Sequence, residues 1–383
     1  MTGATSPTSP SVSSVSSVSS VSSVSSTVPS GVSRPSSGLS RQQFRLLPPP
    51  LPEPRGPLSA AVTARLRGSD PGNAPIPVPP PESCSPYGDD LQLTLYVLYE
   101  LHYQGFEGVP DNLEWDSVLL ACRGEIEDRF LSALRTDLPV DGAETAEQAL
   151  DELQIEPVGD DGSGVSYFLR DEGTLDHVRA YAAVRSLYHL KEADPHAWVI
   201  PRLHGRAKAA MVAVEFDEFG GGRADEIHAQ LFADLMADLG LDTTYGHYVD
   251  AAPAEMLATV NLMSLFGLHR ALRAALVGHF ATVEVTSSPA SRRLAEAMRR
   301  VGAGPAAERF YTEHVTADAV HEQVVRHDVV GGLLEGEPQL DADVVFGIRA
   351  TVHLEDRLAD TLLGAWREGA TGLRGEVPLG PRR

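Results

Sequence analysis

The rest of the chain is expected to be organised around residues 306–325, AAERFYTEHVTADAVHEQVV. The stretch is rich in alanine, follows Pro305 and holds no glycine or proline, a pattern that predicts one helix. His314, Asp318 and His321 stand at offsets of zero, four and seven, so they lie within about 60° of one another on one helical face. A single His–Asp pair is better explained as a solvated polar face. Two imidazoles and a carboxylate have the form of half a metal site, which requires partners elsewhere in the chain.

The composition limits the partners that the protein can have. The chain of 383 residues carries 31 Lys and Arg against 53 Asp and Glu, a formal charge of −22. This charge opposes binding to nucleic acid and to anionic membranes, and it favours a small-molecule partner. Cys84 and Cys122 are too few for a disulfide framework and are expected to be reduced. No apolar run approaches the ~18 residues of a membrane span, so the sequence predicts a soluble, cytoplasmic protein.

The first 86 residues differ from the rest in composition. Ser-Ser-Val triplets recur there and proline-rich pieces follow, so little apolar surface is available to offset the entropy of ordering. Six basic and three acidic residues give this segment a charge of +3, which leaves −25 for the remainder. The sequence therefore predicts a disordered tail over residues 1–86 and one folded domain over residues 87–383.

Apolar residues recur with helical spacing through most of that domain, and no alternating strand pattern with a hairpin turn is present. The chain is therefore predicted to be all-α. Besides residues 306–325, the predicted helices span residues 90–105, 115–134, 144–153, 174–192, 205–219, 224–239, 253–268 with a continuation through 279–285, 290–301 and 341–366.

Acidic and histidine residues at the ends of the middle helices supply the partners for the first stretch. Glu192 ends one predicted helix, Glu218 lies near the end of the next, and Asp225 and His228 stand at i and i+3 on a third. An unbroken helix would separate Glu218 from His228 by about 15 Å. Metal ions in a two-metal site lie only about 3.5–4 Å apart. The three glycines at 220–222 are therefore expected to bend the chain and bring the two side chains together.

Seven side chains form the predicted metal site. Carboxylates together with imidazoles, without cysteine, suit iron or manganese better than zinc. Helical bundles that hold two metal ions use this combination, with a carboxylate and a histidine at i and i+3 on some helices. The candidate ligands are Glu192, Glu218, Asp225, His228, His314, Asp318 and His321.

These motifs resemble the haem-oxygenase-like diiron oxidases, also called iron-containing redox enzymes. The resemblance covers most of residues 91–366. It is most specific in LYELHYQGF from residue 98, in YHLKEADPHAWVIPRL from residue 188, in VEFDEFGGGRADEIHAQLF from residue 214 and in the helix that carries His314. It implies a haem-oxygenase-like helical bundle whose core helices hold two non-haem irons, with O₂ as co-substrate.

The resemblance also implies a role for each candidate ligand. Glu192 corresponds to the ligand of the first core helix, and Glu218 with His228 to the pair of the second. His314, Asp318 and His321 correspond to the triplet of the third core helix, and Asp225 to an additional carboxylate that some members use. No catalytic residue beyond the metal ligands is predicted.

The expected function is an oxidase or oxygenase that hydroxylates, decarboxylates or cleaves a carbon–carbon bond of a small metabolite such as an amino acid or a fatty acid. An external electron donor and a homodimer are compatible with this expectation. The alternative is a non-catalytic metal- or haem-binding bundle, in which one axial imidazole would suffice for haem and the carboxylates would be idle.

Three further charged residues are weaker candidates for the site. Glu284 lies in an otherwise apolar stretch and is expected to contact the ligands rather than to bind metal. Arg292 and Arg293 are candidates for pairing with a substrate carboxylate, although a solvated surface explains them more simply.

Overall fold

Helices are the only extended regular elements in the described part of the chain, so the all-α prediction is confirmed. The computed structural model describes residues 47–68, 74–140, 142–154, 164–375 and 379, apart from the side chains of residues 316–319. No helix among these residues has both the length and the apolar character needed to cross a membrane. The helices are α1 (Pro57–Leu66), α2 (Asp89–Glu100), α3 (Ser117–Asp137), α4 (Ala146–Leu153), α5 (Val165–Asp171), α6 (Leu175–His189), α7 (Asp194–Ala197), α8 (Gly205–Glu218), α9 (His228–Asp238), α10 (Ala254–Leu268), α11 (Arg273–Arg300), α12 (Pro305–Val324), the π-helix Val325–Val330, α13 (Gly331–Gly336) and α14 (Asp341–Arg367).

The long helix α11 packs against both α12 and α14. The backbones of α11 and α14 lie close together at two glycines. A Cβ atom on Gly278 would collide with the carbonyl of Val344, and a Cβ atom on Gly347 would collide with the carbonyl of Ala275. Two glycines therefore allow the two helices to pack this closely. The sequence predicts a break before residue 290, but α11 continues through Pro289 as one helix.

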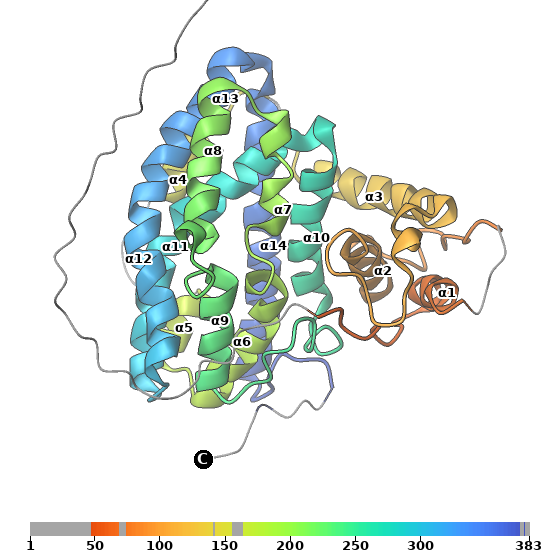
Figure 1. The fold of residues 1–383 in the computed structure, drawn as a ribbon, viewed down its shortest axis with the longest axis horizontal. Helices are drawn as coiled ribbons and strands as arrows, with labels where there is room; N and C mark the ends of the chain where they lie inside the picture. Colours follow the sequence, from red (N-terminus) through yellow and green to blue (C-terminus); the bar gives the residue numbers. More distant parts are fainter. Residues whose placement is uncertain (1–46, 69–73, 141, 155–163, 376–378, 380–383) are drawn as a thin grey trace, which may run out of the picture. The chain divides into compact units, whose positions relative to one another are not determined.

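Helix α12, the stretch that the sequence singles out, packs against α9 and α11 and also contacts α8. Figure 1 shows α12 beside α8 and α9, with α11 behind them. The start of α12 is fixed by Asp238 at the end of α9, whose Oδ2 accepts hydrogen bonds from the backbone N–H groups of Ala306 at 2.6 Å and Ala307 at 3.2 Å. A carboxylate at this end of a helix satisfies free N–H groups and opposes the positive end of the helix dipole.

The folded unit begins earlier than the predicted boundary at residue 86. Helix α1 packs against α2 with Leu58, Val62 and Leu66 buried, and the backbone N–H groups of Leu58 and Ser59 donate to the carboxylate of Asp90. The apolar spacing of four residues is present in the sequence, but the surrounding proline-rich pieces mask it. Residues 1–46 of the predicted tail lie outside the described residues. Figure 1 shows α1, α2 and α3 together beyond α10.

Candidate metal centre

One group of potential ligands consists of Glu192, His228 and His314, which we call cluster one. Each of the three offers a ligand atom, and these atoms all lie within 4.8 Å of one another. Glu192 lies in the turn after α6, His228 is the first residue of α9, and His314 lies on α12. Three residues predicted from distant parts of the sequence therefore converge in space.

A second group, cluster two, consists of Glu218, Glu284 and His321, with ligand atoms that also lie within 4.8 Å of one another. Glu218 is the last residue of α8, Glu284 lies on α11, and His321 lies on α12 two turns after His314. The sequence analysis did not place Glu284 among the ligands. Its signal is a single carboxylate in the otherwise apolar run from residue 274 to 285, in a helix that lines the core.

The two clusters adjoin through Glu218. Its Oε2 lies 2.6 Å from Nδ1 of His228 in cluster one, and its Oε1 lies 3.7 Å from Nδ1 of His321 in cluster two. The two oxygens of one carboxylate thus face one imidazole of each cluster.

The glycine loop between α8 and α9 brings Glu218 next to His228. Gly220, Gly221 and Gly222 all have positive φ angles, of 73°, 60° and 82°, which residues with a side chain rarely adopt. A Cβ atom on Gly220 would also lie only 2.6 Å from the backbone nitrogen of Ile227. The bend expected from the three glycines is therefore present and depends on them.

Two of the predicted ligands are not placed in either cluster. The predicted helix 224–239 begins only at His228, so Asp225 does not share a helical face with it. Asp225 is exposed in the turn before α9 and belongs to neither group. The side chain of Asp318 lies outside the described residues, although its backbone belongs to α12.

Each imidazole of α12 has one ring nitrogen in contact with a group outside the clusters and the other directed at a carboxylate of its cluster. Nδ1 of His314 donates to the carbonyl of Phe310 at 2.7 Å, and its Nε2 is buried without a hydrogen-bond partner, 3.9 Å from Glu192. Nε2 of His321 lies 3.2 Å from Oδ2 of Asp217. Such outer contacts fix the tautomer and the orientation of metal-binding histidines. The donor atoms present therefore fit a pair of iron ions.

Comparison with known proteins agrees with this geometry. Residues 179–356, which include both clusters, match the family model of iron-containing redox enzymes. This part of the chain therefore resembles the iron-containing redox enzymes. The resemblance and the haem-oxygenase-like fold expected from the sequence are thereby confirmed. The chain is also similar to nitrosourea synthase of Streptomyces achromogenes subsp. streptozoticus, with 25% identity over 146 residues. That match covers 38% of this chain and 31% of the relative, so the chain spans about a third of the relative's length.

The carboxylate of cluster one favours its charged form. Burial alone would raise the pKa of Glu192, but the charge and hydrogen bond of His189, 3.1 Å away, together with His314 and His228, bring it down to about 2. A buried anion beside two imidazoles attracts a cation.

A charged form is also favoured in cluster two. Burial opposes the charged form of His321, yet the hydrogen bond and charge of Glu284, the charge of Glu218 and the hydrogen bond of Asp217 raise its pKa to about 9. Glu215, one turn before Glu218 on α8, is buried with neither carboxylate oxygen hydrogen-bonded. Burial and the nearby carboxylates raise the pKa of Glu215 to about 9, so it is protonated at neutral pH in the metal-free protein.

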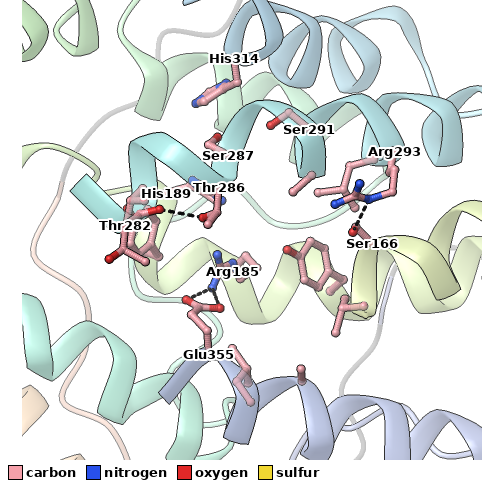
Figure 2. Close-up of a pocket in the computed structure, with 18 of the residues that line it drawn as sticks. Ser166, Arg185, His189, Thr282, Thr286, Ser287, Ser291, Arg293, His314 and Glu355 are labelled. Carbon is pink, nitrogen blue, oxygen red and sulfur yellow. Dashed lines mark hydrogen bonds and ion pairs between the residues drawn. The ribbon is translucent and has the colours of Figure 1, made fainter. Parts of the chain in front are cut away.

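A cavity of about 410 Å³ adjoins cluster one and contacts none of the ligands of cluster two. Its wall includes Glu192 and His314, the aromatic residues Tyr188, Phe310 and Tyr311, and polar side chains from α11. Figure 2 shows Arg185 directed at Glu355 on one wall, and Arg293 directed at Ser166. The residues that line it are Leu153, Val165, Ser166, Tyr181, Arg185, Tyr188, His189, Glu192, Thr282, Val283, Thr286, Ser287, Ala290, Ser291, Arg293, Leu294, Phe310, Tyr311, His314, Thr351, Val352, Glu355, Asp356, Leu358, Ala359 and Leu362.

The two candidate arginines differ in position. Arg292 is exposed, whereas Arg293 lines the cavity. Nε of Arg293 donates to Oγ of Ser166 at 2.9 Å, and its guanidinium lies over the ring of Tyr167 at 4.1 Å. Arg293 therefore agrees with the hypothesis of a substrate contact, and Arg292 agrees with the solvated alternative.

Proposed function

We propose that the protein is an iron-dependent oxidoreductase that binds two non-haem irons and uses O₂ to oxidise a small molecule. The observation that carries this proposal is the position of Glu218, whose two oxygens face an imidazole of each cluster. A carboxylate between two three-residue clusters suits two metal ions about 3.5–4 Å apart. The match to the iron-containing redox enzymes and the mixture of carboxylate and imidazole donors both favour iron.

The irons, when bound, would supply electrons to O₂ and so provide the oxidising power of the enzyme. The chain's own residues hold and orient them. Glu192 provides a carboxylate to cluster one, and Glu284 provides one to cluster two besides Glu218. The carbonyl of Phe310 keeps the proton of His314 on Nδ1 and leaves the lone pair of Nε2 directed at cluster one. An external electron donor would return the site to its reduced form.

The cavity beside cluster one is the proposed substrate chamber. Its aromatic walls exclude water from the side of the site that Glu192 and His314 line. Tyr188 and Tyr311 are buried in this wall and their hydroxyl groups have no hydrogen-bond partner. A buried hydroxyl without a partner costs roughly 1–3 kcal/mol, so these groups are suited to hydrogen-bond a polar atom of the substrate. A molecule the size of an amino acid or a short fatty acid fits this volume.

The geometry does not favour the haem-binding alternative. An axial haem ligand presents one imidazole to an open, flat, apolar pocket. Here His228, His314 and His321 each face a carboxylate, and all three side chains are buried. In a haem-binding protein these carboxylates would have no role.

Oxygen consumption tests the proposal. Full-length protein loaded with Fe(II) under anaerobic conditions and then mixed with O₂ should consume O₂ faster than the same concentration of free Fe(II). Glu218→Ala should abolish this difference, because the carboxylate between the clusters is lost. His102→Ala, which removes a histidine paired with Glu114 outside both clusters, serves as the control. Equal consumption by the wild type and by Glu218→Ala would refute the proposal.

A further inference from the structure

A buried ion pair lies directly behind the turn that presents Glu192. Nζ of Lys191 lies 2.6 Å from Oε2 of Glu100, and the side chains are 2% and 0% exposed. The hydroxyl of Tyr245 donates to the same carboxylate at 2.9 and 3.0 Å. The ammonium group also lies over the ring of Tyr103, 4.2 Å from its centre. The pair thus connects the end of α2 to the turn after α6.

The turn itself has a strained backbone. Helix α6 ends at His189, and the chain turns through residues 190–193 before α7 begins. Ala193 has a φ angle of 76° and is the one residue other than glycine with a positive φ among the described residues. An alanine rarely adopts this conformation, so surrounding contacts must impose it. The sequence predicts a helix up to Glu192, and this turn is the difference.

Neighbouring residues of the turn point to different surroundings. Lys191 reaches Glu100 at the end of α2, whereas Glu192 reaches His189 at 3.1 Å and His314 at 3.9 Å in cluster one. Because consecutive side chains share one backbone, an anchor for Lys191 also fixes where Glu192 lies.

We propose that Lys191 and Glu100 are positioning residues that hold Glu192 in cluster one. The inference rests on the proposed function, since it assigns Glu192 to a metal ion. A buried ion pair contributes little net stability, because the desolvation of both charges offsets their attraction. Its effect in this place is geometric: it fixes a strained turn that would otherwise relax and carry the Glu192 carboxylate away from His228 and His314.

The test uses full-length metal-free protein titrated with Fe(II) under anaerobic conditions against a chelator. The variant Lys191→Met with Glu100→Gln removes both charges, keeps similar volumes and leaves an amide oxygen for Tyr245. Contacts that orient metal ligands affect affinity by about 10–100-fold, so one of the two iron-binding steps should weaken at least tenfold. Glu192→Gln and Glu284→Gln identify which step belongs to which cluster. The double variant at Lys191 and Glu100 should weaken the same iron-binding step as Glu192→Gln.

The controls separate positioning from general stability. Arg65→Met with Asp116→Asn removes another ion pair, of 2.7 Å, outside both clusters and keeps an N-cap for α3, so both binding steps should stay unchanged. If the double variant at Lys191 and Glu100 does not fold, Tyr245→Phe loosens the same network without removing a charge, and it should weaken the same step. If a folded variant kept both iron-binding steps unchanged, or if both steps weakened equally, the inference would be overturned. A wild type that binds fewer than two irons would instead refute the proposed function.

Discussion

Oδ2 of Asp217 lies 3.2 Å from Nε2 of His321, while Oε2 of Glu284 lies 3.3 Å from Nδ1 of the same ring. The imidazole is thus held between a half-exposed carboxylate outside the site and a buried carboxylate inside it. This arrangement, in which an outer carboxylate orients a histidine for metal binding, increases the basicity of the ligand.

Asp217→Asn should therefore weaken iron binding by about 10–100-fold without changing the fold. The amide keeps the size of the side chain but removes the charge that supports His321. Chelator competition measures the affinity, and circular dichroism checks the helices. Glu313 lines the same surface pocket as Asp217 but pairs with Arg309. Glu313→Gln should therefore keep the wild-type affinity for iron. The two variants would behave alike if Asp217 had no orienting role.

Glu284→Gln should reduce the iron content from two per chain to one. The substitution removes one of the two carboxylates of cluster two, whereas cluster one keeps its three residues. Metal analysis after anaerobic loading and desalting gives the stoichiometry. Glu296→Gln, an exposed position on the same helix, should keep two irons. Two irons in Glu284→Gln would mean that Glu284 is not a ligand.

The contribution of Glu215 to the stability of the metal-free protein should fall as the pH rises from about 4.5 to about 9. The folded state raises the pKa of this carboxyl to about 9 from 4.5, so the folded state binds the proton more tightly and loses that advantage across this window. Denaturant unfolding at pH 6 and pH 8.5 measures the trend. Glu215→Gln should have a flatter dependence, by about 1.4 kcal/mol per pH unit and proton, and Glu296→Gln should follow the wild type. Parallel curves for wild type and Glu215→Gln would contradict the assignment.

Deleting residues 1–86 should destabilise the folded domain, whereas a chain that begins at residue 47 should match the full-length protein. The longer deletion removes α1 and exposes the surface that Leu58, Val62 and Leu66 cover. Burial of each such side chain contributes roughly 1.5–3 kcal/mol, so Tm should drop by more than about 5 °C. Thermal denaturation of the three chains decides between this boundary and the one predicted at residue 86. Equal Tm values for the three chains would support the boundary at residue 86.

The sequence was sufficient where the signal is local. The helical period of residues 306–325 and the glycines at 220–222 predict α12 and the bend before His228, because each depends on neighbouring residues. Glu284 was missed as a candidate ligand because a single carboxylate in an apolar helix has no spacing to mark it. Its importance arises only when α11 packs against α12.

Other differences arise from backbone conformations and tertiary contacts that the helical spacing does not encode. Asp225 seemed to pair with His228 because a helix was extended back to residue 224, but the positive φ angles of the glycine loop delay the helix until His228. Glu192 lies in a turn because Lys191 binds Glu100, which is distant in sequence. The homodimer, the cytoplasmic location and the role of Asp318 stay predictions.

Mn(II) titration of the metal-free protein, followed by electron paramagnetic resonance, shows whether two metal ions share Glu218. Manganese suits the same donor set and carries unpaired electrons that report a neighbouring ion. We expect saturation at two Mn(II) per chain, with a spin-coupled signal that appears with the second equivalent and is lost in Glu218→Ala. Saturation at one Mn(II) per chain, or two ions without coupling in the wild type, would refute a shared Glu218.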